Sequence, residues 1–173
     1  MISAIITFVS ILVIAATLLF IAAPRDGFET GIFIAAEPKR VWSLLVDTEA
    51  HSDWNPAMHA VTGSFVEGGR VELVLATPSG GAITFRPKIL AARPAAELRW
   101  RGRLFVPRLF DGEHYFLLTS ENGGTRLVHG EKFRGVALWF MDVRQFIPIF
   151  EATNAALKAR AEGGLGARLN AVA

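Results

Sequence analysis

Two histidines and a glutamate fall on neighbouring β-like segments in the second half of the sequence. The segments "EHYFLLT" and "RLVHGEKFRG" flank Asn122-Gly123, a dipeptide typical of a two-residue hairpin loop. That loop predicts the cross-strand pairs Leu118 with Leu127, Phe116 with His129, and His114 with Glu131. An imidazole opposite a carboxylate can orient a ligand hydroxyl or carbonyl, work as an acid–base pair, or simply satisfy its own hydrogen bonds in the core. The sequence leaves these three interpretations open.

Strict alternation places these residues on one face of the expected sheet. The opposite face of the same segments carries Glu113, Tyr115, Arg126, Lys132 and Arg134, which favours exposure to water. The inward set is rich in aromatic side chains, as small-molecule pockets are, although a filled core has the same pattern. We predict the ligand contacts to be Phe85, Trp100, His114, Phe116, Leu127, His129, Glu131, Phe133, Phe146 and Phe150. His114 and Glu131 are the only candidates for catalysis.

A second polar cluster, "AHSDWNPAMH" at 50–59, has a structural interpretation. Asn55 precedes Pro56, which disfavours helical geometry at Asn55, so the stretch is expected to end a short helix and begin a strand. His51, Asp53 and Asn55 are then expected to satisfy backbone groups of the turn.

The composition argues against several other classes of function. The sequence has no cysteine, and the offset of His114 from His129 disfavours convergence on a metal, so no metal site and no cofactor are predicted. The net charge is only +2 despite a pI near 9.4, which indicates no nucleic-acid partner. Outward basic residues predict a solvated face or, alternatively, attraction to anionic headgroups beside the apolar loop "LFVPRLF" (104–110).

The N-terminal segment 2–23 contains no charge, glycine or proline. About 22 residues of helix reach about 33 Å, close to the hydrocarbon thickness of about 30 Å. A cleaved signal peptide is the alternative, but the apolar run exceeds the usual length of about 7 to 15 residues. We therefore predict a single-pass membrane anchor over 1–24. The basic residues Arg25, Lys39 and Arg40 follow it, which favours a cytoplasmic domain.

The remaining chain predicts one α+β domain over 25–163 and a flexible tail over 164–173. A strand at 27–36 and a short helix from Pro38 to Asp47 come first, and a meander of antiparallel strands from Met58 to Arg134 follows. Helical spacing then covers 138–162, with a bend expected at Pro148 and a stop at Gly163-Gly164. The long helix is the only element large enough to cover the apolar face of the sheet.

This order of elements carries a resemblance to a known family. With "VWSLLVD" and "WNP" early, "GEHYFLLT" and "GTRLVHGEKFRG" late, and "FEATNAALKARAE" at the end, residues 28–162 resemble the START-like (SRPBCC) superfamily, in its polyketide cyclase/dehydrase and lipid-transport branch. The resemblance implies a helix-grip fold, in which a curved antiparallel sheet wraps around a long C-terminal helix and encloses a hydrophobic cavity.

The resemblance also implies binding of an apolar small molecule or lipid, here by a domain with an added N-terminal transmembrane helix. One alternative is a cyclase- or dehydratase-type enzyme that acts on a polyketide-like substrate through His114 and Glu131. A second is a membrane-surface module whose core is filled and which takes no ligand. The sequence indicates no oligomeric state.

Overall fold

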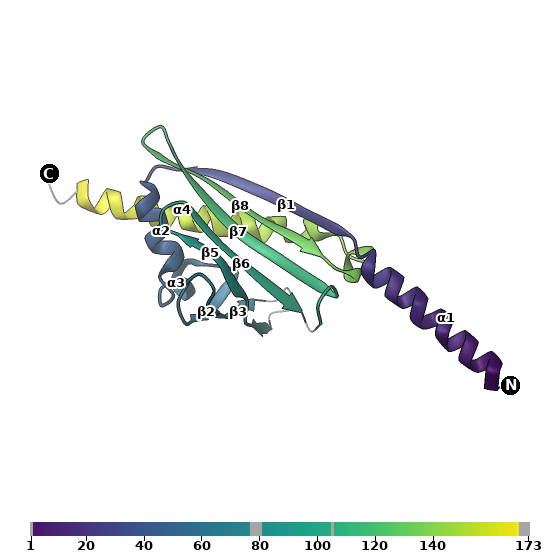
Figure 1. Cartoon of the computed structure of the whole chain (residues 1–173). Helices are drawn as coiled ribbons and strands as arrows, with labels where there is room; N and C mark the ends of the chain where they lie inside the picture. Colours follow the sequence, from purple (N-terminus) through teal and green to yellow (C-terminus); the bar gives the residue numbers. More distant parts are fainter. Residues whose placement is uncertain (1, 77–80, 105, 170–173) are drawn as a thin grey trace.

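The computed structural model describes residues 2–76, 81–104 and 106–169, which form one sheet-and-helix domain preceded by an apolar helix (Figure 1). The elements, in order, are α1 (Ile2–Ile21), β1 (Arg25–Ile34), α2 (Pro38–Val46), α3 (His51–Trp54), β2 (Met58–Thr62), β3 (Glu72–Ala76), β4 (Ala82–Phe85), β5 (Lys88–Arg93), β6 (Glu97–Leu104), β7 (Phe110–Glu121), β8 (Gly124–Arg134), the 3-10 turns η1 (Val136–Trp139) and η2 (Val143–Phe146), and α4 (Ile147–Leu169).

The strands form two antiparallel sheets rather than one continuous meander. The larger sheet has the order β1-β8-β7-β6-β5 and the smaller one β2-β3-β4. The expected meander is interrupted at Arg86-Pro87, which separates β4 from β5. Proline has no backbone N–H to donate to a ladder, so it ends the pairing there. The expectation of a continuous meander from Met58 to Arg134 was therefore wrong at this point.

The hairpin between β7 and β8 has the register that the sequence predicts. His114 faces Glu131, Phe116 faces His129, and Leu118 faces Leu127. The loop residues Asn122 and Gly123 have φ angles of +47° and +77°, the left-handed conformations that a tight hairpin of this twist requires. The register therefore follows from local turn chemistry.

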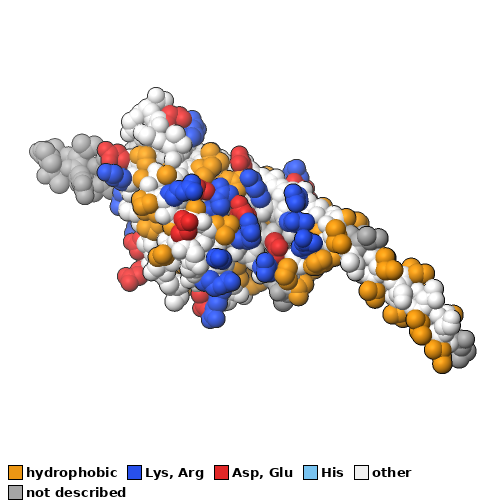
Figure 2. Space-filling model, viewed as in Figure 1, with side chains coloured by type: hydrophobic (Ala, Val, Ile, Leu, Met, Phe, Trp, Pro, Cys, Tyr) orange, Lys and Arg blue, Asp and Glu red, His pale blue; other side chains and the backbone are white. Residues whose placement is uncertain are grey.

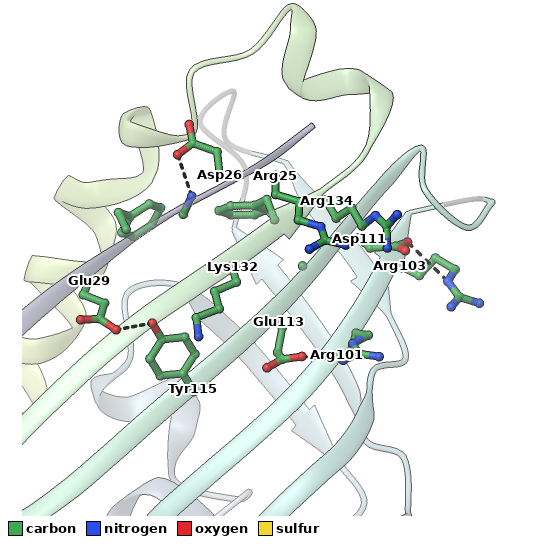
Figure 3. Close-up of a pocket in the computed structure, with 14 residues that line it drawn as sticks. Arg25, Asp26, Glu29, Arg101, Arg103, Asp111, Glu113, Tyr115, Lys132 and Arg134 are labelled. Atoms are coloured by element: carbon green, nitrogen blue, oxygen red, sulfur yellow. Dashed lines mark hydrogen bonds and ion pairs between the residues drawn. The ribbon is translucent and has the colours of Figure 1, made fainter. Parts of the chain in front are cut away.

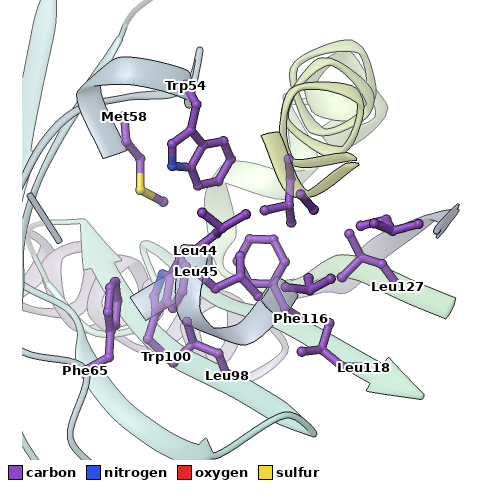
Figure 4. Packing of buried hydrophobic residues seen from close by; sticks show 14 of the residues in the cluster. Leu44, Leu45, Trp54, Met58, Phe65, Leu98, Trp100, Phe116, Leu118 and Leu127 are labelled. Carbon is purple, nitrogen blue, oxygen red and sulfur yellow. The ribbon is translucent and has the colours of Figure 1, made fainter. Parts of the chain in front are cut away.

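Helix α4 covers the inner face of the larger sheet, as the helix-grip arrangement requires (Figure 1). The core between them holds large side chains from α2, α3 and the strands, and Figure 4 shows Leu45, Trp100, Phe116 and Leu127 packed together there. Leu157 and Ala161 of α4 are buried against the same cluster. The predicted α+β class with a long C-terminal covering helix is confirmed.

The limits of α4 differ from the predicted ones. Residues 138–146 are not part of the helix: Asp142 caps η2 through the backbone N–H of Arg144, and α4 begins only at Ile147. Pro148 thus lies in the first helical turn, where its missing N–H has no partner to lose, and no internal proline interrupts the helix. At the other end the helix continues past Gly163 to Leu169, so the predicted stop is wrong. The rest of the expected tail, 170–173, lies outside the described residues.

Helix α1 projects away from the domain (Figure 1) and exposes most of its large apolar side chains. It has 20 residues and ends at Ile21, before Ala23, the last residue of the expected span. Within the described part of the chain, no helix meets the length and hydropathy needed to cross a membrane. The predicted transmembrane helix is therefore not supported.

Candidate ligand-binding site on the inner face of the sheet

Three neighbouring strands bring the predicted polar residues together on the inner face. Trp100 of β6 lies opposite His114 of β7, which lies opposite Glu131 of β8. The rings of Trp100 and His114 stack at 4.3 Å with an interplanar angle of 8°. His129 in turn stacks on Phe116 at 4.1 Å and on Phe150 of α4 at 4.2 Å. Both histidines are buried.

A chain of hydrogen bonds connects these residues to α4 and β1. His114 Nε2 and His129 Nε2 are 2.8 Å apart, and His129 Nδ1 is 2.8 Å from Asn154 Oδ1. The Asn154 amide donates to Thr30 Oγ1 at 2.8 Å, and that hydroxyl donates to the backbone oxygen of His129 at 3.0 Å. At the other end, His114 Nδ1 lies 3.5 Å from Glu131 Oε2. Asn154 of α4 and Thr30 of β1 were not among the predicted residues, although Phe150 of the same helix was.

When both imidazoles are neutral, the donors and acceptors of this hydrogen-bond chain permit only one arrangement of protons. Asn154 Oδ1 accepts, so His129 Nδ1 carries the proton and His129 Nε2 is an acceptor. His114 Nε2 must then donate to His129, which leaves a lone pair on His114 Nδ1. That lone pair faces the Glu131 carboxyl, which therefore fits best as a protonated acid.

Burial shifts the pKa of each group in the direction that this arrangement needs. It lowers the pKa of His114 to about 3 and raises the pKa of Glu131 to about 8. Burial, with a smaller contribution from His114, also holds the pKa of His129 well below its usual value, against the hydrogen bonds that the ring donates to Asn154 and the Phe150 carbonyl. At neutral pH the site therefore holds two neutral imidazoles and a neutral carboxylic acid.

Two adjacent glycines of the sheet have no side chains of their own and are covered by Glu131 and Phe85. Gly102 of β6 and Gly112 of β7 are directly opposite in the ladder, and a side chain at Gly112 would overlap Glu131 Oε1. A Cβ atom at Gly102 would lie 2.6 Å from the ring of Phe85, so Phe85 covers the other glycine. We call Gly102, Gly112, Phe85, Glu131 and Phe133 the glycine recess. The Glu131 side chain keeps an exposed fraction of 20%, so it is within reach of a ligand.

More aromatic side chains extend the recess towards the start of α4. Phe133 stacks on Phe110 at 5.1 Å and lies 6.0 Å from Phe146, while Phe28 meets Phe150 edge to face at 4.7 Å. Phe28, Phe110 and Phe146 are only partly buried. Phe28 and Phe110 were not predicted, although both fall on the inward parity of their strands.

The predicted contact residues thus divide into two groups. Trp100, Phe116 and Leu127 belong to the filled core, where they are almost fully buried. Phe85, Glu131, Phe133 and Phe146 lie around or beside the glycine recess, with His114, His129 and Phe150 between the two groups.

Two pronounced hollows lie on the surface of the described residues, and both are open. The larger hollow, of about 850 Å³, is an open groove on the outer face of the sheet, lined mainly by charged side chains and Tyr115 (Figure 3). The second, of about 430 Å³, lies near Pro38 and the hairpin at Gly123. Neither of these open hollows lies on the inner face of the sheet.

In the polar cluster at 50–59, His51 and Asn55 have the predicted structural role, whereas Asp53 is exposed. His51 Nε2 bonds to the Leu45 carbonyl at 2.9 Å, His51 Nδ1 lies 3.3 Å from Asn55 Nδ2, and Asn55 Oδ1 accepts from Ala57 N at 2.9 Å. Burial lowers the pKa of His51 below its usual value, against the hydrogen bond to the Leu45 carbonyl. Within the described residues, no three acidic or imidazole groups are placed to hold a metal ion.

The sequence matches one family model over most of its length. Residues 26–162 match the family described as "Polyketide cyclase / dehydrase and lipid transport". The chain belongs to this family. No curated protein matches the sequence significantly.

Solved structures of other proteins share the fold of this family member at low sequence identity. A protein of Chromobacterium violaceum is 19% identical with a TM-score of 0.67, covering 79% of this chain and 97% of its own. The di-domain ARO/CYC StfQ of the steffimycin biosynthetic pathway is 17% identical with a TM-score of 0.67, over 82% of this chain and 52% of that one. Ara h 8.0201 is 16% identical with a TM-score of 0.57, over 81% of this chain and 99% of its own.

Proposed function

We propose that the domain binds a hydrophobic small molecule or lipid at the glycine recess, with Glu131 turning its single proton from His114 to a carbonyl or hydroxyl of the ligand. Membership of the polyketide cyclase/dehydrase and lipid-transport family supports a role in hydrophobic ligand binding or cyclase-like chemistry. Apolar pockets with few polar groups are the usual form of such sites.

The observation that carries this proposal is the neutral carboxylic acid above a bare stretch of sheet. A carboxyl whose pKa is raised to about 8 is protonated at neutral pH and can donate a hydrogen bond without bringing a charge into apolar surroundings. Gly102 and Gly112 leave room above the strands, and that room is held by the ends of two side chains that can rotate away. A ligand that displaces the Phe85 ring would lie next to Glu131.

Ligand capture from a lipid extract tests the proposal. The full chain is incubated with the extract, washed, and the retained molecules are identified by mass spectrometry. We expect Glu131→Gln, which keeps a neutral donor, to retain the ligand, and Glu131→Leu to weaken binding about tenfold, as the loss of one buried polar partner does. Gly112→Ala should also weaken binding, because its methyl group displaces the Glu131 carboxyl. Glu151→Gln on the exposed face of α4 is the control; capture of no apolar molecule by the wild type would reject the proposal.

A cyclase- or dehydratase-type enzyme is the second candidate, favoured by the His114 lone pair 3.5 Å from Glu131. In that role Glu131 donates a proton to the substrate as a general acid, and His114 orients it. The rate should then fall as Glu131 ionises above about pH 8. Turnover of a polyketide-like substrate that His114→Ala abolishes would favour the enzyme; saturable binding without turnover would favour the carrier.

A membrane location is a separate proposal, and it rests on the exposed apolar side chains of α1 and the composition of segment 2–23. We expect the full chain to sediment with membranes and to resist an alkaline carbonate wash, and a chain starting at residue 25 to be released by the same wash. Release of the full chain by the wash would contradict attachment through α1. The cytoplasmic placement of the domain follows only from its basic flank, and protease protection in oriented vesicles tests it.

A further inference from the structure

Three segments distant in the sequence meet at the end of the domain where α1 joins it. Gly135 N donates to the Pro24 carbonyl at 3.1 Å, and Val136 N donates to the Arg108 carbonyl at 3.0 Å. The Arg108 guanidinium lies 5.8 Å above the ring of Phe20 in α1. We call the surface formed by residues 106–110, 134–140 and Arg25 the α1 end of the domain.

The α1 end exposes large apolar side chains. The exposed fractions are 91% for Phe140, 52% for Trp139 and 53% for Val106. Single exposed apolar residues are common. Here three such residues from two adjoining segments form a patch beside an apolar helix, and patches of this kind are typical of interaction sites. Tryptophan and phenylalanine in such a position suit the boundary between lipid headgroups and acyl chains.

The outer groove next to this patch becomes more positive towards α1. Its first cross-strand row, nearest α1, holds three arginines and one aspartate: Arg25, Arg134, Asp111 and Arg103. The second row holds two cations and one acid: Lys132, Glu113 and Arg101. The third is balanced, with Glu29, Tyr115 and Arg99. Figure 2 shows Lys and Arg side chains gathered on this face near the base of α1.

The acids of the groove are already engaged by other groups. Glu113 accepts from Arg99 at 2.8 Å and from Arg101 at 2.6 Å, and Glu29 accepts from the Tyr115 hydroxyl at 2.6 Å. Partial burial opposes ionisation of Glu113, but these two arginines outweigh it and hold its pKa below the usual value.

Three cations of the groove are left without an acid. Among the described residues, Arg25, Lys132 and Arg134 have no ion-pair partner, and Arg134 Nε is buried with no hydrogen bond. Arg25 and Arg134 are direct cross-strand partners, an arrangement that is unfavourable for like charges unless an anion joins them (Figure 3).

We propose that the α1 end docks on an anionic lipid bilayer, with Trp139 and Phe140 inserted at the interface and the groove at Arg25, Arg134 and Lys132 taking headgroup phosphates. The apolar patch supplies insertion and the unpaired cations supply selectivity for negative charge. This inference goes beyond ligand binding on the inner face. It also places the half-buried Phe110 and Phe146, next to the glycine recess, at the end of the domain that faces the lipid.

Flotation of the full chain with vesicles tests the groove. Vesicles of phosphatidylcholine alone are compared with vesicles that contain 30% phosphatidylglycerol, about one anionic lipid in three. Any contribution of α1 itself is common to all variants. The ratio of binding to anionic vesicles over binding to neutral vesicles therefore measures the contribution of the groove. We expect this ratio to fall about fivefold for each arginine removed in Arg25→Gln and Arg134→Gln.

The matched control removes the same two charges elsewhere, as Arg40→Gln with Lys88→Gln, both exposed and outside the groove. Thermal unfolding checks that all variants fold. An equal ratio in the groove variants and the control would overturn the proposal. Inorganic phosphate at constant ionic strength distinguishes the source: if millimolar phosphate abolishes the anionic preference, the groove takes free phosphate and lipid docking is rejected.

Insertion is tested by labelling, since the sequence has no cysteine of its own. An environment-sensitive fluorophore is attached at Phe140→Cys or, as control, at Ser120→Cys near the opposite hairpin. We expect a blue shift on vesicle binding at position 140 and none at position 120. A shift at both positions, or at position 120 alone, would overturn the proposed orientation.

Discussion

At the scale of single residues, the unusual feature is a row of connected polar side chains in the core, His114, His129 and Glu131, that carries no net charge. Isolated charges are costly to bury, and here two histidines and a glutamate avoid that cost by remaining neutral. Asn154 fixes which nitrogen of His129 carries the proton, and the effect passes through His114 to Glu131. The protonation state of Glu131 is therefore set partly by an asparagine two hydrogen bonds away from the histidine that faces it.

The pH dependence of stability follows from these pKa values. Glu131 keeps its proton in the folded state up to about pH 8, whereas an unfolded glutamate loses it near 4.5, so between these values the folded state binds more protons and stability falls as pH rises. The buried histidines act in the opposite sense, since their folded pKa values lie below 6.5. Above about pH 6.5 only the Glu131 contribution changes.

We therefore predict that the free energy of unfolding decreases between about pH 6.5 and pH 8, by at most about 2 kcal/mol. Glu131→Gln should remove this decrease, because glutamine does not titrate. Urea unfolding at four pH values measures it, with Glu151→Gln as the control that keeps the decrease. An unchanged profile in Glu131→Gln would mean that Glu131 is already ionised in the folded protein.

At the scale of elements, local rules account for the β7–β8 hairpin and for the faces of its strands. Alternation with a period of two placed His114, Phe116 and His129 inward, and all three are buried. Ile83 has the same parity as the predicted contact Phe85 but is 40% exposed, and its strand β4 is an edge strand of the smaller sheet. Alternation identifies two faces, but it does not tell whether anything covers them.

The hairpin loop gives a prediction at this scale. Gly123→Ala should destabilise the protein by about 1 kcal/mol, because its φ of +77° is costly for a residue with a Cβ atom. Asn122→Gly, in the same loop, should be nearly neutral, since glycine adopts the φ of +47° freely. Thermal unfolding measures both. Equal effects of the two substitutions would show that the loop conformation is not what limits stability.

At the scale of the whole molecule, α4 holds the fold together by closing the inner face of the sheet. Leu157 is fully buried in the main core cluster, and Lys158 beside it donates to the Phe33 carbonyl of β1 at 2.8 Å. The Glu162 carboxylate also accepts from the backbone of Ala35 at 2.7 Å. The helix thus fixes the first strand of the sheet through apolar and polar contacts together.

We predict that Leu157→Ala lowers the free energy of unfolding by about 2 to 5 kcal/mol, the usual cost of removing a fully buried leucine. Arg160→Ala, one turn along on the exposed side of α4, should change it by less than about 0.5 kcal/mol. Urea denaturation measures both variants. A loss below about 1 kcal/mol in Leu157→Ala would indicate that the helix packs loosely on the sheet.

The sequence by itself determined the α+β class, the family, the hairpin register and the inward position of His114, His129 and Glu131. The class, the register and the inward positions follow from local chemistry: turn residues with positive φ, a two-residue side-chain period and the spacing of apolar residues. The family was indicated by a resemblance to known members. The sequence did not determine the split of the sheet at Pro87, the limits of α4, or that Trp100, Phe116 and Leu127 belong to the main core cluster. Nor did it indicate that Asn154 and Thr30 complete the polar chain. Only the tertiary structure decided these points, because they depend on which side chains from distant segments share the same space.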